Sequence, residues 1–345
     1  MIRFLKCWSM VAAVLSGSVF AAGAFLENFD TASPVNFSYG SGGKKASFTH
    51  ISGMESPDEA GTYVLKLELD PEDGAGAWIG PNYTSHQTCH FGRYSARIKT
   101  ASARNSEQPL TGAVVGFYTY YNDQYDESGP KDVNQNGIAD NSEIDFEWLI
   151  ADPRLIYMTA YTDYDDEHGP RKVNRIVNLA TGQILSTTYA TSWDDATDLT
   201  GEENFPETVP AIEGYDASAR FYTYGFDWAK DHIRWWIVNP ADEQDTITLW
   251  DYRGPEERIT QRPASLMLNF WHTNDWPVEG VPGSIEAPAI PFQTQFDWVS
   301  YTPEVSSAIR PRRVPSAVHK ASAVVDLQGR LFEKTPGKGF FLEKR

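Results

Sequence analysis

The sequence predicts an all-β protein built as a β-sandwich of two packed antiparallel sheets. Short runs of strand-forming residues recur between Phe25 and Pro303, and turn residues separate them. Glycine and proline are abundant, at 26 and 21 of 345 residues. No segment has the apolar periodicity of a helix of four turns. These observations favour a single sandwich domain over residues 25–304.

The predicted strands can be placed by their period of two. In residues 93–99, polar side chains alternate with Tyr94, Ala96 and Ile98, so one face is apolar. The clearest predicted strands are 63–69, 92–100, 113–121, 144–150, 155–161, 221–227, 233–238, 266–270 and 292–301.

Three long inserts interrupt the strands. Residues 122–142 are rich in Asp, Asn and Gly, residues 192–214 are acidic and irregular, and residues 272–291 are rich in Pro and Gly. Long loops of a sandwich gather at its rims, where they can form the walls of a binding cleft.

The first 24 residues are typical of a secretory signal peptide. Arg3 and Lys6 form a charged start, residues 8–20 a short apolar core, and Ala22 to Ala24 a small-residue cleavage site. We therefore expect the mature protein to be secreted or at the cell surface. Cys7 lies in the signal, which leaves Cys89 alone in the mature chain and excludes an intramolecular disulfide there.

Residues 305–345 differ in composition from the rest of the chain. Residues 306–322 form a linker rich in Ser, Ala, Pro and Arg, and a basic strand–turn–strand pattern follows. This tail resembles the carboxy-terminal sorting signals of bacterial type IX secretion. A frayed basic tail and an extra hairpin of the body are the alternatives.

The formal net charge is −18, and the basic tail makes the remaining body more acidic still. Such a body repels nucleic acids, anionic membranes and anionic polysaccharides. We therefore expect no nucleic-acid or membrane partner and a neutral substrate. Alternatively, the acidity serves solubility alone.

The sequence from Glu143 to Trp148 is the strongest functional signal. Glu143, Asp145 and Glu147 alternate with Ile144 and Phe146, so a strand places all three carboxylates on one face, whereas a helix would separate them. The Cα atoms of the two glutamates lie about 13 Å apart on a strand. Leaning side chains could approach the ~5–5.5 Å carboxyl separation of retaining glycosidases. The alternative is a structural strand with an acidic, solvent-facing side. The repulsion among its three carboxylates counts against that alternative.

These residues and their flanks resemble glycoside hydrolase family 16, in particular its lichenase-like branch with Glu-x-Asp-x-Glu. The segments that carry the resemblance, in the order the family has them, are 91–99, 112–120, 143–148, 221–228 and 266–271. The resemblance implies a β-jelly roll with a substrate cleft. It also implies that Glu143 is the nucleophile, that Glu147 is the general acid and base, and that Asp145 tunes the nucleophile.

The resemblance also implies substrate-binding residues. Sugar rings stack on aromatic side chains and their hydroxyls need polar partners, and the matching positions are Tyr120, Tyr161, Asn269, Trp271 and Trp276. For each aromatic, core packing is the alternative. Family members often have a tryptophan two residues before the first glutamate, where this sequence has Asn141. Because of that departure, the resemblance does not fix the subsite or the linkage preference of this protein.

No cofactor is expected for catalysis, but structural calcium is possible. Residues 132–143 match the spacing of a calcium loop, although Glu143 cannot be both a bidentate ligand and a nucleophile. The predicted ligands are therefore Asp132, Asn134, Asn136 and Asp140, with an Asx-rich turn as the alternative. The family resemblance separately implies calcium at Asp297.

Together these inferences predict a secreted, monomeric, retaining endo-β-glucanase that hydrolyses neutral β-glucan, with mixed-linkage β-1,3-1,4-glucan as the first choice. The alternatives within the family are a β-1,3-glucanase and a xyloglucan- or galactan-active hydrolase or transglycosylase. A non-catalytic carbohydrate-binding sandwich is the alternative from another class.

Overall fold

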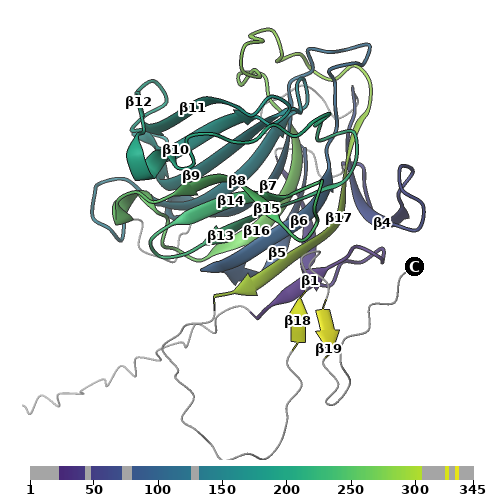
Figure 1. Ribbon diagram of the computed structural model, residues 1–345, viewed down its shortest axis with the longest axis horizontal. Helices are drawn as coiled ribbons and strands as arrows, with labels where there is room; N and C mark the ends of the chain where they lie inside the picture. The colour runs from purple at the N-terminus through teal and green to yellow at the C-terminus, as the bar shows by residue number, and fades with distance from the viewer. Residues whose placement is uncertain are drawn as a thin grey trace, which may run out of the picture.

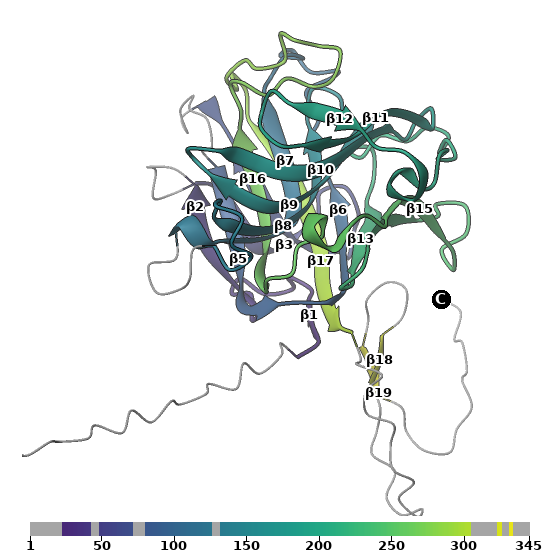
Figure 2. The same ribbon diagram turned by 90° about the vertical axis from the view of Figure 1, so that its left-hand side faces the viewer.

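Two large antiparallel sheets form the body of the protein (Figures 1 and 2). The computed structural model describes residues 23–42, 48–71, 80–125, 132–304, 323–325 and 331–333. The helices whose bounds lie in these ranges are short 3₁₀ turns, η2 (Asp123–Tyr125), η3 (Gly201–Asn204) and η4 (Glu256–Arg258). None of the described helices has the length and apolar composition needed to cross a bilayer. The all-β prediction is confirmed.

The nine-stranded sheet carries the acidic strand, and we call it the site sheet. Its strand order is β12-β11-β10-β9-β8-β7-β16-β5-β2. The bounds are β2 (Phe37–Gly42), β5 (Gly80–Cys89), β7 (Ala113–Asn122), β8 (Asp140–Leu149), β9 (Leu155–Asp165), β10 (Gly169–Asn178), β11 (Gln183–Ala190), β12 (Ala196–Asp198) and β16 (Ala264–His272).

The second sheet covers the other side of the core, and we call it the back sheet. Its order is β15-β14-β13-β6-β17-β4-β3, and β1 also pairs with β17. The bounds are β1 (Phe25–Glu27), β3 (His50–Glu55), β4 (Tyr63–Leu69), β6 (Gly92–Lys99), β13 (Tyr222–Trp228), β14 (Ile233–Val238), β15 (Thr246–Tyr252) and β17 (Phe292–Pro303).

Each predicted strand overlaps a strand of the structure, with ends that differ by a few residues. Two of the three inserts contain regular structure that the sequence did not predict. Strand β8 begins at Asp140, inside the insert 122–142, and the insert 192–214 contains η3 and β12. The edge strand β12 is exposed along its length, so it has no apolar alternation to reveal it.

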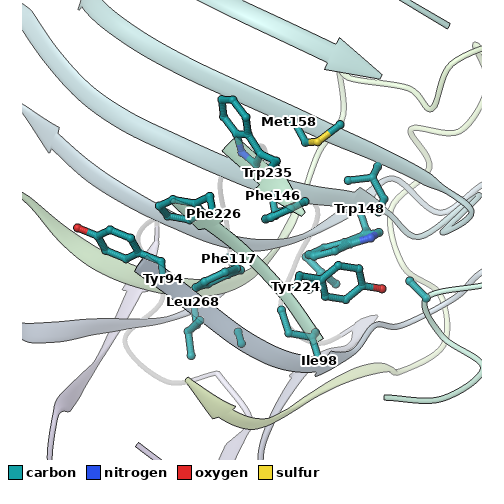
Figure 3. Packing of buried hydrophobic residues seen from close by; sticks show 14 of the residues in the cluster. Tyr94, Ile98, Phe117, Phe146, Trp148, Met158, Tyr224, Phe226, Trp235 and Leu268 are labelled. Carbon is teal, nitrogen blue, oxygen red and sulfur yellow. The ribbon is translucent and has the colours of Figure 1, made fainter. Parts of the chain in front are cut away.

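The core lies between the sheets and is rich in aromatic side chains (Figure 3). The site sheet contributes alternate residues such as Phe117 and Phe146, and the back sheet contributes Tyr224 and Phe226. Phe146 and Tyr224 lie 5.8 Å apart between ring centroids. Burial of one face of every central strand fixes the register, since a slip of one residue would turn the apolar side chains outward. The other face of the site sheet is therefore left for polar residues.

The predicted signal peptide falls almost entirely outside the described residues, and so does most of the predicted tail. Within the tail, β18 (Ala323–Val325) and β19 (Leu331–Glu333) pair as antiparallel strands, as the strand–turn–strand pattern predicts. The sorting function of the tail stays a prediction. Cys89 is buried and free.

Candidate active site

Strand β8 presents its two faces as the sequence predicts. Ile144 and Phe146 are fully buried in the core, while Glu143, Asp145 and Glu147 project from the opposite face of the site sheet. On the core side, Trp235 Nε1 donates a 2.9 Å hydrogen bond to the backbone oxygen of Asp145. This bond and the pairing with both neighbouring strands hold the middle of β8 rigidly.

Pairing with β7 and β9 supplies the neighbours of each carboxylate. Glu143 lies between Tyr120 on β7 and Tyr161 on β9. The structure therefore places these two predicted aromatics directly beside the predicted nucleophile. Farther along β8, Asp145 lies opposite Tyr118, and Glu147 lies opposite Gly116.

Glu143 is the one carboxylate of the three that receives a side-chain hydrogen bond from Asn141. Asn141 Nδ2 donates to Glu143 Oε2 over 3.0 Å. Burial raises the pKa of Glu143 to about 7, and the Asn141 bond and the Lys172 charge oppose this rise. Donation to the charged form favours an ionised carboxylate, which a nucleophile requires.

Glu147 has a different environment. Burial and the neighbouring charge of Glu143 raise its pKa to about 8, while Lys172 opposes the rise. The Asn141 hydrogen bond favours the charge on Glu143, and the Glu143 charge in turn favours a proton on Glu147, as acid–base catalysis requires. The roles of the two glutamates stay a prediction.

Asp145 is the most deeply buried of the three carboxylates. Burial, then the charges of Glu143 and Glu147, raise the pKa of Asp145 well above its usual range. Its Oδ2 atom is buried and has no hydrogen-bond partner among the described residues. A protonated Asp145 can donate to a neighbouring carboxylate or to a bound sugar, and this suits a tuning role between the glutamates.

Lys172 brings a positive charge to the same face. It lies on β10 in register with Tyr161, which is in turn in register with Glu143. The Lys172 Nζ atom lies 3.4 Å from the Tyr161 hydroxyl and 5.2 Å from the centre of its ring. Burial lowers the pKa of Lys172, and the charges of Glu147, Asp145 and Glu143 oppose that effect.

We expect Lys172→Met to move the pH profile of activity to higher pH. The Lys172 charge lowers the pKa of Glu143 and of Glu147, so its loss raises both. Glu143 must be ionised and Glu147 protonated, so the acidic limb and the alkaline limb both shift upward. The pH dependence of kcat/KM measures the shift. Lys172→Arg keeps the charge and should keep the profile, and an unmoved profile in Lys172→Met would contradict the electrostatic role.

Asn269 on β16 has one amide atom satisfied and one available. Its Nδ2 donates to the Tyr118 hydroxyl over 3.0 Å, and its buried Oδ1 has no partner among the described residues. That Oδ1 packs against Gly116, where an added Cβ atom would lie 2.4 Å from it and would force the Asn269 amide to move. Asn269 Oδ1 is thus an unpaired acceptor beside Gly116, which pairs with Glu147.

The two predicted tryptophans lie beyond Glu147. Trp271 is 6% exposed and packs with Val114, Leu149 and Tyr157, and the half-buried Trp276 packs against this cluster. The Tyr157 and Trp276 rings meet edge to face at 5.2 Å. Packing is thus a demonstrated role for Trp271, and sugar contact by either tryptophan stays a prediction.

The predicted calcium ligands each have protein partners, although Asp140 Oδ1 is buried without one among the described residues. Both carboxylate oxygens of Asp132 accept backbone N–H groups, from Asn136 and Gly137. Asn134 Oδ1 accepts the same Asn136 N–H, an arrangement typical of Asx turns. Asp140 Oδ2 accepts from the Val133 N–H and lies 3.3 Å from Arg262 Nη1.

Asp297 is likewise engaged, because its Oδ2 lies 2.5 Å from Arg97 Nη1. Across the described part of the chain, no three His, Cys, Asp or Glu side chains are grouped to hold a metal. Calcium binding at either place stays a prediction.

The sequence did not reveal three of the residues that shape this face. Asn141 was visible only as a departure from the family pattern, and Lys172 and Gly116 carried no signal. Lys172 is placed by a register shift between Arg171 and Lys172 in the pairing of β9 with β10. A bulge of this kind cannot be located from one strand, since it depends on the partner strand.

Comparison with known proteins agrees with the resemblance. A β-glucanase of Brevibacillus brevis is 34% identical over 90 residues, which are 26% of this chain and 30% of that protein. A β-glucanase of Paenibacillus polymyxa is 33% identical over 89 residues, 26% of this chain and 32% of that protein. Over this stretch the chain is similar to the bacterial β-glucanases. No protein-family model matches it.

The match to these β-glucanases spans about a third of their length. Among solved structures, a lichenase from a mouse hindgut metagenome aligns with a TM-score of 0.46 and 19% identity, over 82% of this chain and all of that one. The Crh5 transglycosylase aligns with a TM-score of 0.48 and 17% identity, over 82% of this chain and 85% of that one.

Proposed function

We propose that the protein is an endo-acting β-glucanase that hydrolyses a neutral β-glucan with retention at the anomeric carbon. The observation that carries this proposal is the face of β8, where Glu143 and Glu147 have different environments on either side of Asp145. The similarity to bacterial β-glucanases supports the substrate class.

In the proposed reaction, ionised Glu143 attacks the anomeric carbon while Glu147 donates its proton to the departing glycosidic oxygen. The product of this step is a glycosyl ester of Glu143. Glu147, now ionised, takes a proton from water, which attacks the same carbon and releases Glu143. Two inversions give net retention. Asp145 holds a proton near Glu143 and limits the repulsion among the three carboxylates.

The remaining residues of the face would bind the sugar. Tyr120 and Tyr161 flank Glu143, and each offers a flat ring and a hydroxyl. Asn269 Oδ1 and the carboxyl oxygen Asp145 Oδ2 are buried without described protein partners, and a buried polar atom left unpaired costs about 1–3 kcal/mol. Sugar hydroxyls would satisfy both atoms.

A panel of neutral polysaccharides tests this function. We expect reducing ends to be released from mixed-linkage β-1,3-1,4-glucan faster than from β-1,3-glucan, xyloglucan or galactan. Proton NMR during the first minutes should show the β-anomer first, since retention preserves that configuration. Release of the α-anomer first would exclude the retaining mechanism.

The same panel separates the alternatives. Binding of glucan without release of reducing ends would indicate a carbohydrate-binding module and would overturn the enzymatic proposal. Incorporation of an added oligosaccharide acceptor into larger products would indicate a transglycosylase. We further propose that the mature protein is secreted, on the basis of residues 1–24, and monomeric. The position of the chain in cell fractions and its mass in solution test these two points.

A further inference from the structure

Trp193 has an unusual environment for a tryptophan. Its side chain is 59% exposed, and among the described residues it is the only tryptophan with so large an exposed fraction. It lies in the turn between β11 and β12, within the insert 192–214. A single exposed apolar residue requires no explanation by itself. The exposed ring of Trp193 is also held in place by contacts with its neighbours.

The turn and its neighbours hold the Trp193 ring in a defined place. Thr191 Oγ1 donates to Asp195 Oδ2 over 2.7 Å and closes the turn. The Cδ1–Nε1 edge of the ring lies beside Gly169, where a Cβ atom would meet Trp193 Cδ1 at 3.4 Å. Tyr164 meets the ring edge to face, with 6.1 Å between centroids. The ring is thus exposed and also supported.

Lys172 links Trp193 to the active site. The Lys172 Nζ atom lies 4.8 Å from the centre of the Trp193 ring and 5.2 Å from that of Tyr161. Because Tyr161 is in register with Glu143, the row Glu143, Tyr161, Lys172, Trp193 crosses the site sheet from β8 past β10. Neighbouring strands are about 4.8 Å apart, so β11, which leads into the Trp193 turn, lies roughly 15 Å from β8.

We propose that Trp193 is the platform of an outer sugar subsite, which stacks a neutral pyranose ring of the same β-glucan chain. This inference rests on the proposed function. The C–H groups of a pyranose face carry partial positive charge and are attracted to the negative face of an indole ring. Lys172 lies over the ring and fixes the platform beside Tyr161.

The charges around the platform favour a neutral ligand. Asp194 and Asp195 are exposed in the same turn, and Asp166 and Glu167 are exposed in the turn before Gly169. Anionic sugars would be repelled by these carboxylates. Hydroxyl groups can instead donate hydrogen bonds to them. The subsite therefore suits glucosyl units and not uronic acids or sulfated sugars.

The test is Trp193→Ala, with Trp193→Phe as the conservative variant. We expect Trp193→Ala to lower kcat/KM on barley β-glucan about 3- to 10-fold relative to its kcat/KM on a short oligosaccharide, mainly through KM, since a ring contact is worth roughly 0.5–1.5 kcal/mol. Trp193→Phe should recover most of the loss. The oligosaccharide product lengths should also change.

Phe205→Ala is the matched control. Phe205 is another exposed aromatic, at 54%, and it lines a separate hollow with residues of the β14–β15 hairpin. This variant should keep the wild-type ratio of the two substrates. A thermal midpoint of Trp193→Ala equal to that of the wild type would show that the loss is not one of folding.

The outcomes distinguish this inference from the proposed function. If the wild type hydrolyses β-glucan and Trp193→Ala keeps the wild-type substrate ratio and products, the subsite is wrong and the function stands. If the wild type binds barley β-glucan in affinity gels without hydrolysis, and Trp193→Ala binds more weakly, the function is wrong and the platform stands. If the wild type neither binds nor hydrolyses the glucan, both are wrong.

Discussion

Glu143→Ala is expected to reduce turnover of β-glucan by roughly four orders of magnitude or more, since loss of a nucleophile removes the covalent route altogether. The position of Glu143 supports this size of effect. It lies between Tyr120 and Tyr161, and Asn141 donates to its carboxylate. Initial rates of reducing-end release on barley β-glucan provide the measurement.

Azide provides a sharper test of the Glu143 role. The alanine side chain leaves space on the face that the carboxylate occupied, and azide can attack the anomeric carbon from there. With an activated β-glycoside, we expect partial recovery of cleavage and an α-glycosyl azide as product. A β-glycosyl azide would contradict the assignment of Glu143 as nucleophile.

Glu147→Ala is expected to lower turnover of β-glucan by roughly 10²- to 10⁴-fold, the usual contribution of a general acid and base. The loss should be much smaller on a substrate whose leaving group needs no proton. Burial raises the pKa of Glu147 to about 8, so the wild-type alkaline limb reflects loss of the Glu147 proton. In the variant this limb should disappear from the kcat/KM profile.

Azide should give the opposite stereochemistry in Glu147→Ala. The glycosyl ester on Glu143 still forms from an activated substrate, and azide then displaces it to give a β-glycosyl azide. Recovery of the α-product would reverse the roles of the two glutamates. Glu202→Ala is the matched control for both variants, because Glu202 is an exposed carboxylate on η3 and should retain wild-type rates.

The sequence predicted the central features of the fold because they are local. Each strand with one buried face repeats its apolar residues with a period of two, and β4, β6 and β13 could be found in this way. The edge strand β12 could not, since all three of its residues are exposed and none carries a burial pattern. The composition of the sequence revealed the inserts, but it did not reveal the regular structure inside them.

The candidate site likewise has features that the sequence predicts and features that it does not. The three carboxylates share a face because alternation along one strand places them there, and no other part of the chain is needed to see it. Their different environments depend on contacts across the sheet. Asn141 reaches Glu143 next to an irregular register between β8 and β9, and Lys172 reaches the same face after a register shift between β9 and β10.

The sequence by itself thus determined the all-β class and the row Glu143, Asp145, Glu147. Only the tertiary structure decided which of the two glutamates favours its charge, since that depends on the Asn141 hydrogen bond and on burial by neighbouring strands. It also brought Lys172 and Trp193 to the Glu143 side of the site sheet. The physical reason is that alternation is a property of one strand, whereas burial, charge interaction and register depend on residues far apart in the chain.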